Sequence, residues 1–353
     1  MKKYIYILLA LAVVFGAVTA WNWLRDNKIP NFNSRCELFV YPDTPVRAVE
    51  DSLCAHVRNV KSIHRIFASK DVDNYMEPGH YVVEKGASSV YAARMLNNGW
   101  QTPVRLTLSG TLRKKGEIAR KIAVQMMVDS ASVHRALDDR ALLGKYGFTP
   151  QNAFSLLVPD TYEMYWTASV EEILDRQKAA YDAFWNEENL AKARKLGLSK
   201  EQVSIVASIV SGETNNVPEM PKIAGVYLNR LKIGMKLQAD PTIAYCYGYS
   251  INRILRKHLD FDSPYNTYKN TGLPPGPIYV PTRNTLNAVL NPDCGTASGM
   301  PGKDGYIFFC ANSDFSGTHV FAKTLSQHNE NAKAFHKALT KRLDEKKKAA
   351  AKS

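Results

Sequence analysis

The chain has 353 residues, ordinary apolar and charged fractions, and a formal net charge of +13. This length predicts about two or three domains, and the composition suits a globular protein with a sizeable core and does not indicate disorder. A dispersed basic surface suits an anionic polymer, an anionic membrane surface or nucleic acid. The sequence contains no zinc finger, no RNP-type motif and no basic stripe with interleaved aromatic residues. We therefore expect no nucleic-acid partner.

The N-terminus carries a candidate membrane anchor. Two lysines precede an apolar run over residues 4–24, which is long enough to span a bilayer as a helix. Its length and its tryptophans, Trp21 and Trp23, favour a retained anchor, although the small residues 17–20 could also form a signal-peptide cleavage site. Residues 1–3 would then be the cytoplasmic end, and the rest of the chain would lie on the other side of the membrane.

The cysteines give little information about compartment or cofactor. The sequence has five of them, and none forms a Cys-x-x-Cys pair, which argues against a zinc site or a thioredoxin-like motif. The count is odd, and a chain of this length does not need disulfide staples. We therefore expect buried thiols, no metal site and no cofactor.

A polar linker, residues 25–33, leads into a mixed region over residues 34–110. Short patterns of both kinds alternate there, with strands at 37–41, 80–83 and 104–108 and helices at 44–57 and 88–97. Elements this short indicate a small α/β module that grasps a substrate, and they do not suit a long parallel sheet. Residues 111–197 are mainly helical, apart from a turn and extended segment at 157–165, and Gly197 is a natural stop.

The segment 198–342 begins with a helix that is apolar around most of its circumference. Ser199 and Gln202 form a capping box, and the apolar residues that follow indicate a buried central helix. A second helix is predicted from Pro218 to about residue 232. The remainder is rich in Pro, Gly, Asn and Tyr, which predicts loops and short strands wrapped on the helices. The basic tail, residues 343–353, is typical of a solvated helix end.

Glu213 lies in the last turn of the predicted central helix, on the apolar side that Val206 and Ile209 define. Burial and the negative end of the helix dipole both raise the pKa of a carboxyl in that position. A carboxyl that is protonated near neutral pH can donate a proton to the leaving oxygen of a glycoside. Considered by position alone, a solvent-facing glutamate at a helix end is the more ordinary interpretation.

The loops that follow Glu213 carry amides, hydroxyls and aromatic rings, which are the groups that bind sugars. Each residue alone is a weak signal, because a polar loop is usually only a loop and a histidine is often structural. The candidate substrate-binding residues are Asn229, Gln238, Asp240, Thr242, Tyr265, Asn266, Tyr268 and His319. For Asp240, a turn-capping role before Pro241 is an equally good explanation.

Several motifs occur in a fixed order along this half of the chain. They are IVASIVSGET at 205–214, IAGVYLNRL at 223–231, GMKLQADPT at 234–242, YNTY at 265–268 and GLPPG at 272–276. Together they resemble the endolytic murein transglycosylase family (MltG, YceG-like). The apolar run at 4–24 is similar to the single-pass anchor of that family. Residues 79–83 and 92–99 resemble its LysM-like module more loosely.

The resemblance implies an α+β protein with four parts: a transmembrane helix, a LysM-like α/β module, a helical middle region, and a catalytic domain of buried helices wrapped by loops and short strands. It places the catalytic glutamate on Glu213 and substrate-binding groups on Asn229, Gln238 and Asp240. Many members have a first acid two residues earlier, where this chain has Ser211. Glu219 resembles a further acid of the family, and we treat it as a possible secondary acid.

The resemblance also implies the reaction and its partners. We expect an endolytic lytic transglycosylase that cleaves the bond between N-acetylmuramic acid and N-acetylglucosamine within peptidoglycan glycan strands, leaving 1,6-anhydro ends and terminating or trimming nascent strands. Its partners would be glycan strands, the bacterial inner membrane and cell-wall synthases (penicillin-binding proteins). Two alternatives stay open. One is an anchored muramidase that uses Asp240 or Glu219 as its second carboxylate. The other is a glycan-binding scaffold without catalysis.

Overall fold

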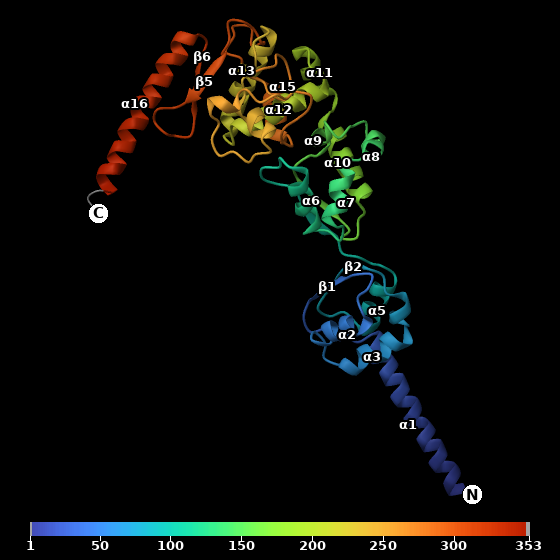
Figure 1. Ribbon diagram of the computed structural model, residues 1–353. Coiled ribbons are helices and arrows are strands. Elements are labelled where there is room, and N and C mark those ends of the chain that lie inside the picture. Colours follow the sequence, from blue (N-terminus) through green and yellow to red (C-terminus); the bar gives the residue numbers. More distant parts are fainter. Residues whose placement is uncertain (1, 351–353) are drawn as a thin grey trace. The chain divides into compact units, whose positions relative to one another are not determined.

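The computed structural model describes residues 2–350, which form two units (Figure 1). Unit 1 contains the chain up to Leu106 together with Ile122–Val128 and Thr161–Ser169. Unit 2 contains Thr107–Lys121, Asp129–Asp160 and the chain from Val170 onward. Helices and small antiparallel sheets occur together, so the predicted mixture of helix and strand is confirmed. Met1 of the predicted cytoplasmic end and residues 351–353 of the predicted basic tail lie outside the described residues.

The apolar run at the N-terminus forms one long helix, α1 (Lys2–Asn27). Its large apolar side chains are exposed from Tyr4 to Leu24. Within residues 2–350 it is the one helix long and apolar enough to cross a membrane. The predicted apolar helix is therefore confirmed, and it continues into unit 1 by about one turn beyond the predicted segment.

The rest of unit 1 packs short helices on a two-stranded antiparallel sheet. Strand β1 (Cys36–Val40) pairs with β2 (Gly79–Val83), and the alternate residues Cys36, Leu38 and Val40 enter the core. The helices are α2 (Val46–Cys54), α3 (Val60–Ser69), α4 (Val72–Tyr75) and α5 (Ser89–Asn97). A second small sheet pairs β3 (Val104–Thr107) with β4 (Thr161–Met164). The predicted strands and helices of this region are confirmed, with ends shifted by a few residues.

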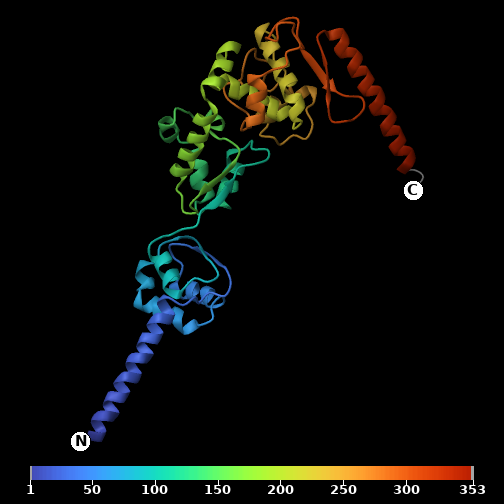
Figure 2. The ribbon, with the colours of Figure 1, turned by 180° about the vertical axis from the view of Figure 1, so that it is seen from behind.

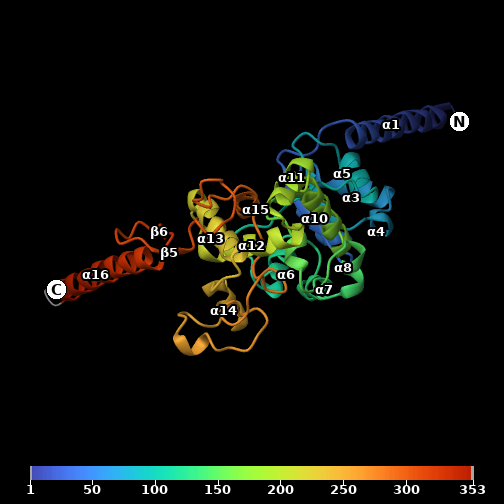
Figure 3. The same cartoon turned by 90° about the horizontal axis from the view of Figure 1, so that it is seen from above.

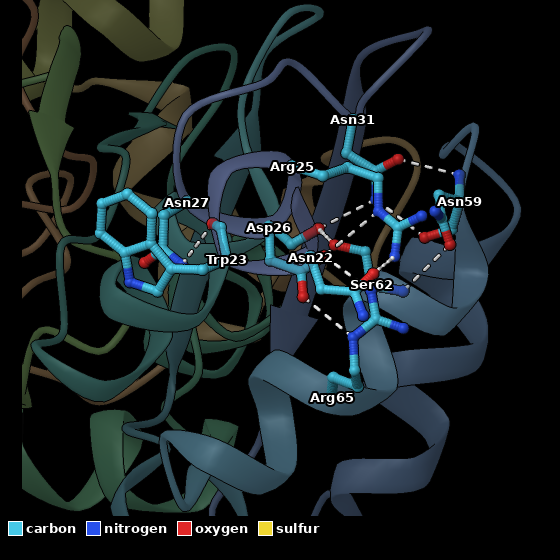
Figure 4. A network of polar contacts seen from close by, with 10 residues as sticks. Asn22, Trp23, Arg25, Asp26, Asn27, Asn31, Asn59, Ser62 and Arg65 are labelled. Carbon is cyan, nitrogen blue, oxygen red and sulfur yellow. Dashed lines mark hydrogen bonds and ion pairs between the residues drawn. The ribbon is translucent and has the colours of Figure 1, made fainter. Parts of the chain in front are cut away.

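Figure 4 shows how polar groups around the buried Asp26 fix the end of α1 to α3. Arg65 donates to both carboxylate oxygens of Asp26, from Nε at 2.9 Å and from Nη2 at 2.7 Å. Beside them, the Asn31 amide donates to Ser89 Oγ and accepts from the backbone N–H of Asn59. Because a buried carboxylate is costly without compensation, this two-pronged pair stabilises the contact between the end of α1 and α3.

Unit 2 begins with the predicted helical region. Its helices are α6 (Lys115–Ala123), α7 (Ser130–Ala136), α8 (Arg140–Lys145), α9 (Ala153–Leu156), α10 (Val170–Phe184) and α11 (Glu187–Leu196), of which the last two residues of α6 belong to unit 1. Gly197 ends α11 in the left-handed conformation, with φ of 70°. This confirms the stop that the sequence predicts, since glycine adopts that conformation without a steric penalty.

The centre of unit 2 is α12 (Lys200–Glu213), which is buried from Val203 to Val210. Ser199 and Gln202 form the predicted capping box at its start. After a short 3-10 turn, η1 (Val217–Glu219), helix α13 (Met220–Lys232) follows, and both helices pack on α15 (Arg283–Leu290). Figure 3 shows these three helices together, viewed from above. The predicted buried helix and its neighbour are confirmed.

After residue 232 the predicted short strands are present, but the sequence prediction missed several helices. The structure has α14 (Asp240–Cys246), a 3-10 turn η2 (Arg256–His258), α15, and the long helix α16 (Leu325–Ala350). Strands β5 (Phe308–Ala311) and β6 (His319–Ala322) form an antiparallel hairpin against which α16 packs, as Figure 2 shows from behind. Proline and asparagine obscured the two short helices, because α14 and α15 depend on tertiary burial more than on intrinsic propensity.

All five cysteines are free thiols. Cys36 and Cys294 are buried, as expected of structural thiols, and Cys54, Cys246 and Cys310 are half-buried. Burial raises the pKa of each thiol, which keeps it protonated and unreactive near neutral pH.

Candidate active site

Glu213 is the last residue of α12 and is half-buried. Tyr227 donates its hydroxyl proton to Glu213 Oε1 at 2.6 Å. Removal of the carboxyl from water raises the pKa of Glu213 to about 7, and the negative charge of Asp240 acts in the same direction. The Tyr227 hydrogen bond and the positive charge of Arg230 oppose this rise without cancelling it. The carboxyl is therefore close to half-protonated at neutral pH.

Helix α13 provides two side chains that act on Glu213, Tyr227 and Arg230. Tyr227 is fully buried, and burial beside the Glu213 charge raises the pKa of its hydroxyl well above the ordinary value, so Tyr227 acts only as a donor. Arg230 donates from Nε to the carbonyl of Ile307 at 2.8 Å and from Nη1 to the carbonyl of Leu237 at 2.5 Å. Because these partners are neutral, the charge of the guanidinium is available to stabilise an ionised Glu213.

Close packing at Gly212 brings α14 against the end of α12. A Cβ atom at Gly212 would lie 2.5 Å from Cβ of Pro241 and 2.9 Å from the ring of Tyr279, so no larger residue fits there without a shift. Asp240, the first residue of α14, is exposed and accepts a hydrogen bond of 2.5 Å from the Tyr268 hydroxyl. The glycine thus lets a second carboxylate approach Glu213.

The turn before α14 is held by two buried threonines. Thr242 Oγ1 donates to the carbonyl of Ala239 at 2.7 Å and lies 2.9 Å from Thr267 Oγ1, which also accepts from the Ala239 N–H. Gln238, just before this turn, has φ of 49° and an exposed side chain, and its N–H donates to the carbonyl of Thr267. A left-handed conformation is unfavourable for a glutamine, and such strain is often found at functional sites.

Three of the predicted substrate-binding residues are buried and already hydrogen-bonded. The amide of Asn229 donates to the carbonyls of Cys294 and Tyr306 and accepts from the Gly302 N–H. Asn266 donates to two carbonyls of its own loop and accepts from the Tyr268 N–H. Thr242 is occupied in the same way. These three side chains organise the loops of the site and have no N–H or O–H donor left for a sugar.

Glu219 and His319 form a pair of their own. Glu219 Oε1 accepts from the His319 N–H at 2.6 Å, and its Oε2 lies 3.3 Å from His319 Nδ1. The imidazole packs edge-on against Phe309, whose ring in turn contacts Tyr227. The pair therefore ties the start of α13 to β6 and supports the Tyr227 side of the site.

The structure thus brings together Glu213, Asp240 and Tyr268, with Gln238 two residues before Asp240 in the same turn. Tyr265 lies elsewhere, in ring contact with Tyr245 near the C-terminal end of α14. Sequence reasoning missed Tyr227 and Arg230, both on α13. A signal existed, since a tyrosine on a buried stripe needs a partner for its hydroxyl and an arginine follows it three residues later on the same helix.

A cavity of about 390 Å³ opens beside the end of α12. Ser211 and Thr214, which flank Glu213, form part of its wall together with Asn215, Tyr279, Thr282 and Thr285. Hydroxyl and amide groups around one tyrosine ring form a surface suited to a sugar. Within residues 2–350, no group of three or more His, Cys, Asp or Glu side chains is arranged to hold a metal ion.

These features define a class of protein with an exposed apolar N-terminal helix and a half-buried glutamate of raised pKa at the end of a central helix. The YceG-like family matches residues 38–334. A crystal structure of a putative YceG-like protein from Listeria monocytogenes is similar in fold, with a TM-score of 0.52 and 25% identity. That similarity covers 84% of this chain and 99% of the Listeria chain. The protein belongs to the YceG-like family, as the motifs predict.

Relatives with an assigned activity are also similar to this chain. An endolytic murein transglycosylase of Bacillus subtilis is 41% identical over 140 residues, which are 40% of this chain and 36% of that protein. An endolytic murein transglycosylase of Streptococcus pneumoniae is 28% identical over 184 residues, 50% of this chain and 31% of that protein. The matches thus span about a third of the length of these relatives.

Proposed function

We propose that this protein is an endolytic lytic transglycosylase that cleaves peptidoglycan glycan strands, with Glu213 as its single acid and base. The observation that carries the proposal is the Glu213 carboxyl itself, whose pKa of about 7 lets it donate a proton and later accept one at neutral pH. The family and the two murein transglycosylase relatives supply the substrate class.

The reaction needs no water and no second catalytic carboxylate. Protonated Glu213 donates its proton to the glycosidic oxygen, and the bond from that oxygen to C1 of N-acetylmuramic acid breaks. The ionised Glu213 then removes the proton from the C6 hydroxyl of the same sugar as that oxygen closes onto C1. The product is a 1,6-anhydro end, and Glu213 is protonated again.

The hydrogen bond from Tyr227 determines which carboxyl oxygen carries the proton. Tyr227 occupies Oε1 as a donor, so the transferable proton is on Oε2. When Glu213 becomes ionised, the same hydrogen bond and the charge of Arg230 stabilise it. Both groups are held before substrate arrives, which removes the cost of reorganising them during the reaction.

The sugar-facing groups are those that the structure leaves accessible. We assign substrate binding to Gln238, Asp240 and Tyr268, and sugar packing to the cavity beside Ser211 and Thr214. Asn229, Thr242 and Asn266 hold the loops, whereas Glu219 with His319 positions α13. Tyr265 contributes through the tyrosine group at the C-terminal end of α14.

The remaining assignments concern location and partners. We propose that α1 is a single-pass anchor in the inner membrane, with both units on the extracytoplasmic side, and protease protection of intact and permeabilised cells tests this orientation. Unit 1 would be a LysM-like glycan-binding module, supported by its antiparallel strand pair with helices α2, α3 and α4 between the strands in the chain. Association with penicillin-binding proteins is a further prediction that cross-linking in cells tests.

The decisive experiment is mass spectrometry of the products released from purified sacculi by the full-length protein in detergent. We expect long strand fragments with 1,6-anhydromuramyl ends, which internal cleavage produces. Reducing muramyl ends would instead show a hydrolase, with Asp240 as the nearer second carboxylate. Binding to sacculi without any cleavage would indicate a scaffold, and the proposed activity would then be wrong.

A further inference from the structure

A second hollow, of about 540 Å³, lies at the C-terminal end of α14. Arg113 and Lys114, just before α6, and Lys115, its first residue, line the hollow together with Tyr245 and Tyr249. Three consecutive basic residues and two aromatic rings around one hollow form a surface for a ligand that is anionic and partly apolar.

Arg113 differs from its two neighbours in having no carboxylate partner among residues 2–350. Lys115 Nζ lies 2.5 Å from Asp138, and Lys114 Nζ lies 4.0 Å from Glu117. The Arg113 guanidinium is half-buried and lies over the Tyr249 ring, 4.7 Å from its centroid. Stacking on an aromatic ring holds the planar group in place while its N–H donors stay available.

This hollow is connected to the catalytic carboxyl through α14 and a row of tyrosines. Asp240 at the start of α14 approaches Glu213, and the seven residues of the helix span about 10 Å. The Tyr249 ring contacts the ring of Tyr279, whose edge borders Gly212 immediately before Glu213. A peptide attached to a sugar at Glu213 would extend along α14, over about its length, to reach Arg113.

We propose that Arg113 and the surrounding hollow bind a carboxylate of the peptide that a murein strand carries on its N-acetylmuramic acid, making Arg113 a specificity residue. The inference rests on the proposed function. A guanidinium recognises a carboxylate through two parallel hydrogen bonds, and the tyrosine rings pack against the apolar part of the peptide. The enzyme then favours strands with peptides over bare strands.

The experiment compares full-length Arg113→Gln with Arg140→Gln, a matched loss of charge at an exposed residue of α8 outside the hollow. The substrates are soluble strands with intact peptides, the same strands after an amidase has removed the peptides, and peptide-bearing strands whose carboxylates are converted to methylamides. We expect Arg113→Gln to lower kcat/KM about 10-fold more on intact strands than on the other two, mainly through KM. Arg140→Gln should behave like wild type.

Two results would overturn the inference. One is an equal loss on all three substrates, which indicates a structural role, and the melting temperature of the variant then identifies misfolding. The other is a wild-type enzyme that cleaves intact, bare and methylamidated strands equally well. Failure of the proposed function has a different signature, because wild type would then release no 1,6-anhydro product from any substrate.

Discussion

Two carboxylates, the buried Asp26 of unit 1 and the half-buried Glu213 of unit 2, have opposite environments. Asp26 receives two charged hydrogen bonds from Arg65, one on each oxygen. Glu213 receives one hydrogen bond from a neutral tyrosine, and the nearby Arg230 donates to backbone carbonyls instead. The first carboxylate is fully compensated and serves as a structural contact. The second is under-compensated, and its pKa therefore rises into the range that acid-base catalysis uses.

The largest expected effect comes from removing the ionisable group at Glu213. We expect Glu213→Gln to lower kcat by about 10³-fold or more, because the amide can neither donate nor accept the transferred proton. Binding to sacculi should be nearly unchanged. The exposed Glu163→Gln is the matched control, and cleavage at the wild-type rate by Glu213→Gln would show that another group is the acid.

The same variant tests whether Glu213 is under-compensated. The folded protein raises the pKa of this carboxyl from 4.5 to about 7, so it binds more protons than the unfolded chain between these values. The free energy of unfolding of the wild type therefore decreases as pH rises from about 4.5 to about 7. Glu213→Gln has no carboxyl at this position, so its stability does not decrease for this reason. We expect Glu213→Gln to be more stable than wild type at pH 8 by about 1 to 3 kcal/mol, with little difference near pH 4.

Breaking the compensated pair in unit 1 should affect stability and leave the chemistry intact. Arg65→Met leaves the Asp26 carboxylate buried without its two donors, and we expect unit 1 to lose about 2 kcal/mol, since Arg65 is itself partly exposed. Hydrogen exchange of the α3 amides measures the loss, with exposed Arg58→Met as control. Unchanged protection would mean that the pair contributes nothing to the fold.

A third change acts on the contact between α12 and α14, which brings the negative charge of Asp240 near Glu213. Gly212→Ala places a methyl group against Pro241 and Tyr279, so α14 must move away. We expect a loss of about 1 to 3 kcal/mol in unit 2, together with lower activity. Gly144→Ala, where nothing lies within 4 Å of the added atom, is the control in thermal unfolding. A neutral Gly212→Ala would show that the two helices can separate freely.

The smallest effects should have opposite signs at the two neighbours of Glu213. Tyr227→Phe removes an interaction that lowers the Glu213 pKa, so the alkaline limb of the pH-rate profile should move to higher pH. Asp240→Asn removes a charge that raises this pKa, so the limb should move to lower pH. We expect shifts of up to about one pH unit, read from kcat/KM between pH 5 and 9. Shifts in one common direction would contradict this account of the site.

Local patterns predicted the elements whose evidence lies within one segment. The capping box at Ser199, the apolar circumference of α12 and the stop at Gly197 all depend on neighbours in sequence, and all three are confirmed. The physical argument for Glu213 also came from its own helix. Its position on the apolar side gave the correct direction for its pKa.

The partners of Glu213 could not be read in this way, because they come from other segments. Tyr227 and Asp240 reach it only when α13 and α14 pack against α12. The α14 contact depends on the missing side chain at Gly212. Asn229 shows the converse. Its residue type suits sugar binding, yet its three hydrogen bonds go to backbone groups 65 to 77 positions away in sequence.

The backbone conformation of Gln238 implies a compromise between folding stability and activity. At φ of 49° a glycine would relieve the strain, which for a residue with a β-carbon costs about 1 kcal/mol or more. The chain instead carries a long amide there, exposed and two residues before Asp240. The protein therefore gives up a fraction of its folding free energy at this turn to keep one side chain. A substitution at Gln238 that makes the protein more stable should therefore lower its activity.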